Sequence, residues 1–138
     1  MPSPLENLAA SGQLHREPVD RREYDGLVIS GRARLADAEN RGLAVESRFD
    51  LAYNAAHALS LAALRRAGFR PVNRYIVFQT LPHTLGLGPE VWRVLAKAHQ
   101  KRNDAEYEGF ADVEERLVGD VIAAAHAVEH ALDAWRPI

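Results

Sequence analysis

The sequence predicts an all-α protein, a four-helix up-and-down bundle with additional short helices. Apolar residues recur at steps of three and four over several long stretches, which is the spacing that lines one face of an α-helix. Typical helix start and stop residues bound most of these stretches, and no segment reads as a strand with a convincing partner. With 138 residues, the chain is expected to form a single domain, residues 1–138, around one core.

The first part of the chain contains a leader and a long helix. We expect residues 1–18 to be extended or to form a short helix. An apolar stripe then predicts a helix over residues 24–38. Gly31 lies on this stripe and would let a second helix approach closely. Arg41 followed by Gly42 is a plausible end for the helix.

A second long helix follows. Its expected start is Ser47, which together with Asp50 resembles a capping box that has Asp in place of the usual Glu. Its expected end is marked by Arg65 and Arg66 followed by Gly68, because cations in the last turn and a glycine after it favour a helix C-terminus.

The segment 74–81 is ambiguous, since residues 75–78 suit a strand as well as a helix. A lone strand lacks a partner, so we predict a short helix that ends near Pro82. The next long helix begins at Pro89, a favoured first helical residue, and stops near Gly109.

The last long helix is predicted to begin around Ala111 and to carry an apolar stripe as far as Trp135. The expected core of the bundle consists of the apolar residues Leu27, Leu59, Leu64, Leu95, Leu117, Val121 and Val128.

Composition describes an ordinary globular protein, with 47% hydrophobic and 26% charged residues and a formal net charge of −2. This charge argues against general coating of nucleic acid, so RNA contact would need a local basic patch. There are no cysteines, which excludes disulfides and thiol chemistry. We see no secretory signal and no apolar run of about 20 residues, and we expect a cytoplasmic protein without a membrane segment or a cofactor.

Arg102 stands out because it continues an apolar stripe of its helix. Trp92, Leu95, Ala98 or His99, and Arg102 follow one another at steps of three and four. A guanidinium group on such a stripe must be paired, bind a ligand or face a partner subunit, because an unpaired buried charge is too costly. The alternative is an arginine at a fraying helix end that extends its charge to water.

Four segments occur in an order that resembles a known family: residues 49–57, 67–71, 81–86 and 102–107. Together they look like a HEPN domain, a small helical module of eukaryotes and prokaryotes, and the similarity spans roughly residues 47–135. The resemblance implies a four-helix bundle that forms a homodimer. Many members are metal-independent ribonucleases, often toxins paired with a small nucleotidyltransferase that acts as antitoxin.

The family's catalytic signature is an Arg, commonly followed by Asn, Asp or His, and a His four to six residues later. Arg102 and Asn103 match its first part, but Tyr107 stands at the first permitted His position and no His follows it there. Tyrosine has an ordinary pKa of about 10 and is a poor general base at pH 7. We therefore expect Arg102, Asn103 and Tyr107 to form the functional centre, with His99 and His57 as further candidates.

Two functions follow. The missing histidine favours a non-catalytic HEPN-like protein that binds RNA or a nucleotide and is related to toxin–antitoxin components. The retained Arg102–Asn103 pair supports an alternative, a metal-independent endoribonuclease toxin that acts as a homodimer with Arg102 at the shared cleft. We expect Arg102, Asn103 and Tyr107 to bond to one another or across the two-fold axis, unless the helix ends by Asp104 and leaves them as separate surface groups.

Charged runs flank this motif. Six cations could gather into a basic patch: Arg65, Arg66, Arg70, Arg74, Lys97 and Lys101. Six carboxylates make the region downstream of Arg102 acidic: Asp104, Glu106, Glu108, Asp112, Glu114 and Glu115. Such an acidic run repels a phosphate backbone unless it pairs internally or faces away.

A second motif, His126 with Glu129 and His130, matches the inverted zinc-protease pattern H-x-x-E-H. Such a site needs at least one further ligand and a cleft. The sequence offers neither, so we interpret the motif as a solvated helix face and predict no metal site.

Overall fold

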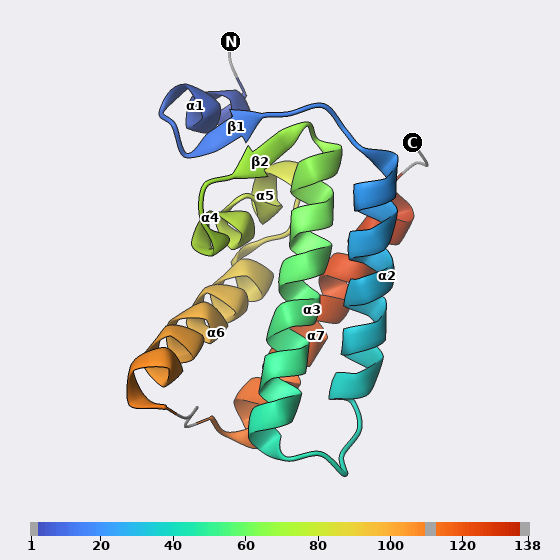
Figure 1. Ribbon diagram of the computed structural model, residues 1–138, viewed down its shortest axis with the longest axis vertical. Helices are drawn as coiled ribbons and strands as arrows, with labels where there is room; N and C mark the ends of the chain where they lie inside the picture. Colours follow the sequence, from blue (N-terminus) through green and yellow to red (C-terminus); the bar gives the residue numbers. More distant parts are fainter. Residues whose placement is uncertain (1–2, 110–112, 136–138) are drawn as a thin grey trace.

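The computed structural model describes residues 3–109 and 113–135 and shows an all-α fold with several short helices, as the sequence predicts (Figure 1). In the described residues, a two-stranded sheet accompanies the helices. The elements in chain order are α1 (Pro4–Ala10), β1 (Leu14–Arg16), α2 (Arg21–Ala38), α3 (Val45–Arg66), β2 (Phe69–Pro71), α4 (Arg74–Gln79), α5 (Leu81–Thr84), α6 (Pro89–Glu108) and α7 (Glu115–Ala134).

The four long helices alternate in direction. In Figure 1, α2 and α6 descend while α3 and α7 ascend, which is the expected up-and-down order. α3 packs against both α2 and α7, whereas α6 is inclined to α3 and packs on α7 and α4 (Figure 1). Within the described part of the chain, no helix combines the length and apolar character needed to cross a membrane.

The predicted start of α3 is wrong. α3 begins at Val45 rather than Ser47, and the residue before it, Ala44, makes no side-chain cap. Val45 packs against the core, and this burial extends the helix beyond the residues that could have capped it. The predicted start of the last helix, Ala111, lies outside the described residues, and α7 begins at Glu115.

The ends of α6 agree with the sequence. Pro89 opens α6, and Gly109 closes it with a φ of 84°, a left-handed conformation that suits glycine.

Other ends differ from the prediction. α2 begins at Arg21, where Asp20 caps it, and ends at Ala38 rather than at Arg41 and Gly42. The predicted short helix after residue 74 is present as α4, but it ends at Gln79, and Pro82 lies inside α5 rather than ending a helix.

A short antiparallel pairing between two distant segments was not predicted. β1 pairs antiparallel with β2, so that Leu14 lies opposite Pro71 and Arg16 opposite Phe69. The expectation that no strand finds a partner is therefore wrong. Each strand is only three residues long, too short to show an alternating pattern. The expected leader is thus held in place, as α1 followed by β1.

The core forms around α3, because its sequence is rich in alanine. Ala52, Ala55, Ala56, Ala62 and Ala63 are fully buried. Their small side chains let the backbones of α2 and α7 come close on both sides of α3.

The predicted core residues are buried with one exception, since Leu27 is half-buried at the edge. Leu64 belongs to a separate, smaller apolar cluster beneath the N-terminal segment. That cluster contains Leu5, Leu14, Leu64, Phe69 and Ile76.

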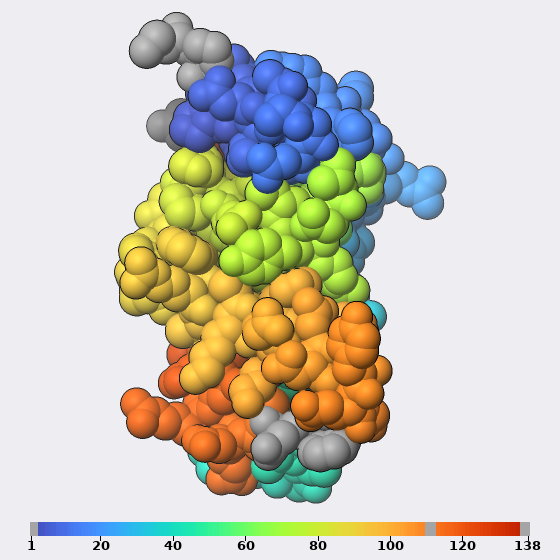
Figure 2. Space-filling view, turned by 90° about the vertical axis from the view of Figure 1, so that its left-hand side faces the viewer, coloured from blue at the N-terminus to red at the C-terminus, as the bar shows by residue number. Residues whose placement is uncertain are grey.

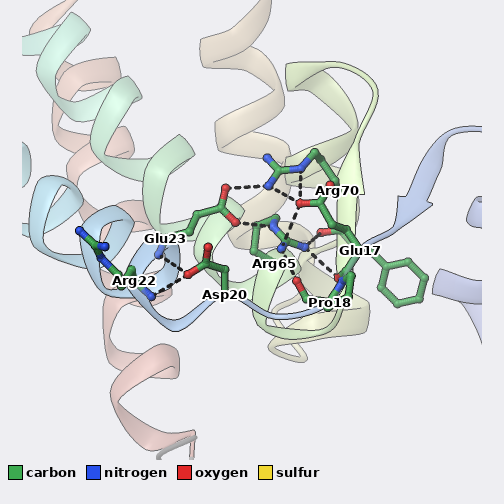
Figure 3. Close-up of polar contacts among 8 residues, drawn as sticks. Glu17, Pro18, Asp20, Arg22, Glu23, Arg65 and Arg70 are labelled. Atoms are coloured by element: carbon green, nitrogen blue, oxygen red, sulfur yellow. Dashed lines mark hydrogen bonds and ion pairs between the residues drawn. The ribbon is translucent and has the colours of Figure 1, made fainter.

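Arg65 is the main buried charge of the fold, with a side chain only 1% exposed (Figure 3). It does not belong to a surface patch, so this part of the predicted basic cluster is wrong. Its Nε donates to Glu23 at 2.6 Å, and its two terminal nitrogens donate to the carbonyl oxygens of Glu17, Phe69 and Pro18.

Arg70 completes this cluster (Figure 3). Its guanidinium group donates to Glu17 through Nε at 2.8 Å and to Glu23 through Nη2 at 2.7 Å. Hydrogen bonding from Arg70 lowers the pKa of Glu17 below its ordinary value. Burial alone would raise the pKa of Glu23, but hydrogen bonds from Arg70 and Arg65 outweigh it and lower that pKa too.

We expect opposite effects from two glycine substitutions in α2. A Cβ at Gly31 would lie 2.7 Å from Cγ of Leu59 and 3.4 Å from the carbonyl oxygen of Ala55, whereas one at Gly26 meets nothing within 4 Å. Overpacking costs about 1–3 kcal/mol, and relief of a helical glycine gains about 0.5–1 kcal/mol. Thermal melts should show a lower Tm for Gly31→Ala and a higher Tm for Gly26→Ala. Equal shifts would contradict the close contact of α2 and α3.

Acid should weaken the Arg65 cluster. The pKa values of Glu17 and Glu23 lie below 4.5 in the folded protein, so their contribution is complete above about pH 4.5 and is lost as pH falls through the folded pKa values. Glu23→Gln should destabilise the protein at pH 7 by about 1–3 kcal/mol, as for hydrogen bonds to charged groups. This deficit should shrink in denaturant titrations at lower pH.

The matched control is Asp25→Asn, which removes only an exposed ion pair with Arg21 on the same helix. Its effect should stay within about 0.5 kcal/mol at every pH. A Glu23→Gln deficit that does not change with pH would contradict the depressed pKa.

Candidate functional site

Arg102 lies on α6 with its side chain 30% exposed. The helix continues to Glu108, so the alternative in which it ends by Asp104 is excluded. The guanidinium carbon lies 5.1 Å from the centroid of the Tyr53 ring, and the nearest carboxylate, that of Glu106, is 3.8 Å away. No hydrogen bond to another described residue engages the guanidinium group, which leaves its donors available to a ligand.

Tyr53 of α3 is the centre around which the site is arranged. It is fully buried, and its neighbours one turn away on the same helix face are Phe49 and His57, with ring centroids 6.4 and 6.5 Å distant. A second guanidinium group, that of Arg74 on α4, lies 5.5 Å from the Tyr53 ring. Two cations thus flank one buried phenol ring.

His99 connects Tyr53 to Asn103. Its Nδ1 lies 3.0 Å from the Tyr53 hydroxyl, and its Nε2 lies 3.2 Å from the amide nitrogen of Asn103. Because an amide nitrogen only donates, Nε2 accepts and Nδ1 carries the proton in this arrangement. Burial lowers the pKa of His99, and the charges of Arg74 and Arg102 lower it further. The imidazole is therefore neutral at pH 7, as this arrangement of hydrogen bonds requires.

His57 is also a neutral imidazole. It lies edge-on to Phe78 at 5.9 Å, and within the described part of the molecule its Nε2 is buried without a hydrogen-bond partner. Burial, aided by the charge of Arg74, lowers the pKa of His57 to about 4. The ring of His57 stacks with that of Tyr53 and carries no charge at neutral pH.

Tyr75 adds a ring that is open to solvent. It lies on α4, is 39% exposed, and its centroid is 5.3 Å from that of His99. α4 and α6 lie side by side on one face of the molecule, below the N-terminal segment (Figure 2). This face therefore combines Tyr75 and Arg74 from α4 with His99, Arg102 and Asn103 from α6.

The structure does not bring Tyr107 to this centre. Its side chain is 94% exposed, and no hydrogen bond or ring contact joins it to Arg102 or Asn103 in the residues described. Although Asn103 and Tyr107 are four residues apart on one helix, the phenol extends into solvent. The residues that do lie beside His99 and Arg102 are Tyr53, Arg74 and Tyr75, and none of them was placed at the site from the sequence.

A signal for Tyr53 was present, because Phe49, Tyr53 and His57 follow one another at helical spacing. Arg74 and Tyr75 gave no such signal. Their place depends on how α4 packs against α3 and α6, which local patterns do not encode.

Carboxylates surround the other side of Arg102. A hollow of about 200 Å³ beside it is lined by Glu46, Asp50 and Glu106 as well as by Arg102 itself. An anion approaching from this side would meet three carboxylates. Arg74 does not line this hollow, and its Nη2 donates to Oδ1 of Asn54 at 3.1 Å.

The wider basic patch expected from the sequence does not form. Arg65 and Arg70 are bound to carboxylates, and Arg66 lies over the ring of Trp135 at 4.3 Å. Lys97 borders a separate hollow beside α7. In the described residues, the cations left at the site are those of Arg74 and Arg102.

No protein-family model, curated protein or solved structure matches this chain. The resemblance to HEPN domains therefore rests on the sequence motifs alone.

We expect the two flanking cations to control the protonation of His99. Arg102→Gln removes one positive charge, so the pKa of His99 should rise toward its ordinary value, as measured by NMR titration of the imidazole protons. Arg93→Gln is the control, because Arg93 lies nine residues earlier on α6 and thus on its opposite face. Equal pKa values in wild type and Arg102→Gln would show that the charge of Arg102 does not contribute to the lowered pKa.

Proposed function

We propose that this protein is a non-catalytic HEPN-like module that binds RNA or a nucleotide through the face formed by α4 and α6. The observation that carries this proposal is the position of Arg74 and Arg102, whose guanidinium carbons lie 5.5 and 5.1 Å from the Tyr53 ring. The ring of His99 lies 6.3 Å from that of Tyr53 and 5.3 Å from that of Tyr75. Guanidinium groups donate paired hydrogen bonds to phosphate. An exposed ring such as Tyr75 offers a stacking surface for a base.

The hydrogen bonds of His99 support binding rather than cleavage. A general base needs a free lone pair near the reacting hydroxyl. The lone pair of Nε2 is engaged by the Asn103 amide, and Nδ1 is directed at the Tyr53 hydroxyl. In this arrangement His99 orients Asn103, whose amide can contact a ligand.

The carboxylates beside Arg102 limit the size of the ligand contact. Glu46, Asp50 and Glu106 disfavour an extended phosphate backbone on that side. The proposed contact is therefore one or two phosphates with a neighbouring base. For single-stranded RNA, a plot of log K against the logarithm of the salt concentration has a slope of about −0.7 for each phosphate contact. With one or two contacts, the affinity should therefore depend only weakly on salt.

Fluorescence anisotropy with a short, labelled single-stranded RNA tests this proposal. Arg102→Gln and Arg74→Gln should each weaken binding about tenfold or more, since a hydrogen bond to a charged group contributes about 1.5–3 kcal/mol. Arg93→Gln, with the same charge change on the opposite face of α6, should bind like wild type. Absence of wild-type binding, or equal losses in all three variants, would contradict the site.

A specific observation favours a second function, that of a metal-independent endoribonuclease. The neutral imidazole of His99 lies one turn from Arg102 and could accept a proton once Asn103 moves aside. In this case the protein would act as a homodimer with Arg102 at the shared cleft, paired with a nucleotidyltransferase-type antitoxin. Light scattering would test the dimer.

An RNA-cleavage assay in the presence of EDTA separates the two functions. Cleavage by the wild type that is lost in both His99→Gln and Arg102→Ala would establish the ribonuclease and exclude the binding module. If the ribonuclease exists, Tyr107→His should raise its activity by supplying the motif's histidine. If the wild type and Tyr107→His both bind RNA without cleaving it, the ribonuclease is excluded and the binding role is supported.

A further inference from the structure

A second cluster of ionisable groups lies away from the α4–α6 face, where α7 packs against α2. His126, Glu129 and His130 each have one potential ligand atom, and these atoms all lie within 4.8 Å of one another. The two histidines are four residues apart and therefore lie on one face of α7, with ring centroids 6.3 Å apart. This is the H-x-x-E-H motif, for which the sequence alone offered no further ligand.

The structure adds a carboxylate from another helix, but on the far side of the His126 ring. Glu39, which follows the last residue of α2, places a carboxylate oxygen against Nε2 of His126. Nδ1 of His126 faces Glu129 at 3.3 Å. Glu39 can therefore orient His126 from outside the cluster, because a metal-ligating histidine commonly donates its other ring N–H to a carboxylate.

We propose that His126, Glu129 and His130 of α7 form a binding site for a zinc-class divalent transition metal, with Glu39 at the end of α2 orienting His126 through its other ring nitrogen. Imidazole and carboxylate are the ligands that Zn²⁺ accepts in the absence of cysteine. With metal–ligand bonds of about 2.0–2.2 Å, tetrahedral ligand atoms lie about 3.3–3.6 Å apart, so the present separations need adjustments of about 1 Å.

The exposure of the side chains permits such adjustments. The side chains of His126 and Glu39 are 39% and 49% exposed, and His130 is also exposed. They can change rotamer without disturbing the core. His130 is exposed to solvent, so water can complete the coordination of the ion.

A neighbouring cation, Arg32, competes with the ion for Glu129. Arg32 of α2 pairs with Glu129 at 3.4 Å and also with Asp133. Its charge opposes a second positive ion and competes for Glu129. Arg32→Gln should therefore raise the affinity for the metal.

Isothermal titration calorimetry with ZnCl₂ at pH 8 tests the site, using the full chain with any affinity tag removed. We expect about one Zn²⁺ per chain and a higher Tm with Zn²⁺, since a ligand that binds only the folded state stabilises it. Mg²⁺ should give neither effect, because it prefers oxygen ligands and keeps its waters. Histidine NMR signals of His126 and His130 should shift on addition of Zn²⁺.

Ligand variants decide whether this cluster is responsible. We expect at least about a tenfold loss of Zn²⁺ affinity in His130→Gln and in His126→Gln. Loss of a group that only supports a ligand already costs about 10–100-fold, and loss of a ligand should cost no less. Glu39→Gln should also lower the affinity, by a smaller factor than loss of a ligand, because Glu39 orients His126 from outside the ligand set. The control is His83→Gln, an exposed histidine on α5.

Zn²⁺ binding that survives His130→Gln, or that is lost equally in His83→Gln, would overturn the proposal. So would a wild-type chain whose Tm and histidine signals do not respond to Zn²⁺. Because His130 is exposed, its variant is expected to fold, and a wild-type circular dichroism spectrum for that variant would confirm this.

Discussion

The guanidinium group of Arg65 holds together three segments that are far apart in the sequence. Its donors reach the side chain of Glu23 at the start of α2, the carbonyl oxygens of Glu17 and Pro18 before α2, and that of Phe69 in β2. A buried guanidinium group is tolerated only when its donors are satisfied in this way. The cluster therefore determines where the N-terminal segment lies and how α2 enters the bundle.

The position of α2 in turn permits the close packing of α3. Gly31 meets Leu59 across the α2–α3 contact, and no side chain would fit between them. With one face of α3 closed in this way, the face that carries Tyr53 is covered by α4 and α6. The candidate site is thus a consequence of helix packing, and its cations are held against a rigid ring.

Local patterns in the sequence were sufficient for the class of fold and for most helix ends. Pro89 and Gly109 act through their own backbone preferences, so their roles can be read without the structure. Arg65 was predicted as a surface cation of a helix end because three of its partners, in Glu17, Pro18 and Glu23, lie more than 40 residues away. Tyr107 was predicted at the site from a motif, but its exposure depends on what packs beside α6, which spacing along one helix does not specify.

Electrostatics connects the candidate site to its proposed ligand. Arg74 and Arg102 lower the pKa values of both His57 and His99, in addition to burial. A bound phosphate would neutralise these cations and thereby favour protonation of His99, the more exposed of the two. By thermodynamic reciprocity, a proton on His99 would strengthen phosphate binding by the same factor. Protonation would also end the hydrogen bond that Nε2 accepts from Asn103, so the amide would be released toward the ligand. If the proposed function is correct, the neutral His99–Asn103 pair is the resting form of a site in which anion, proton and amide are coupled.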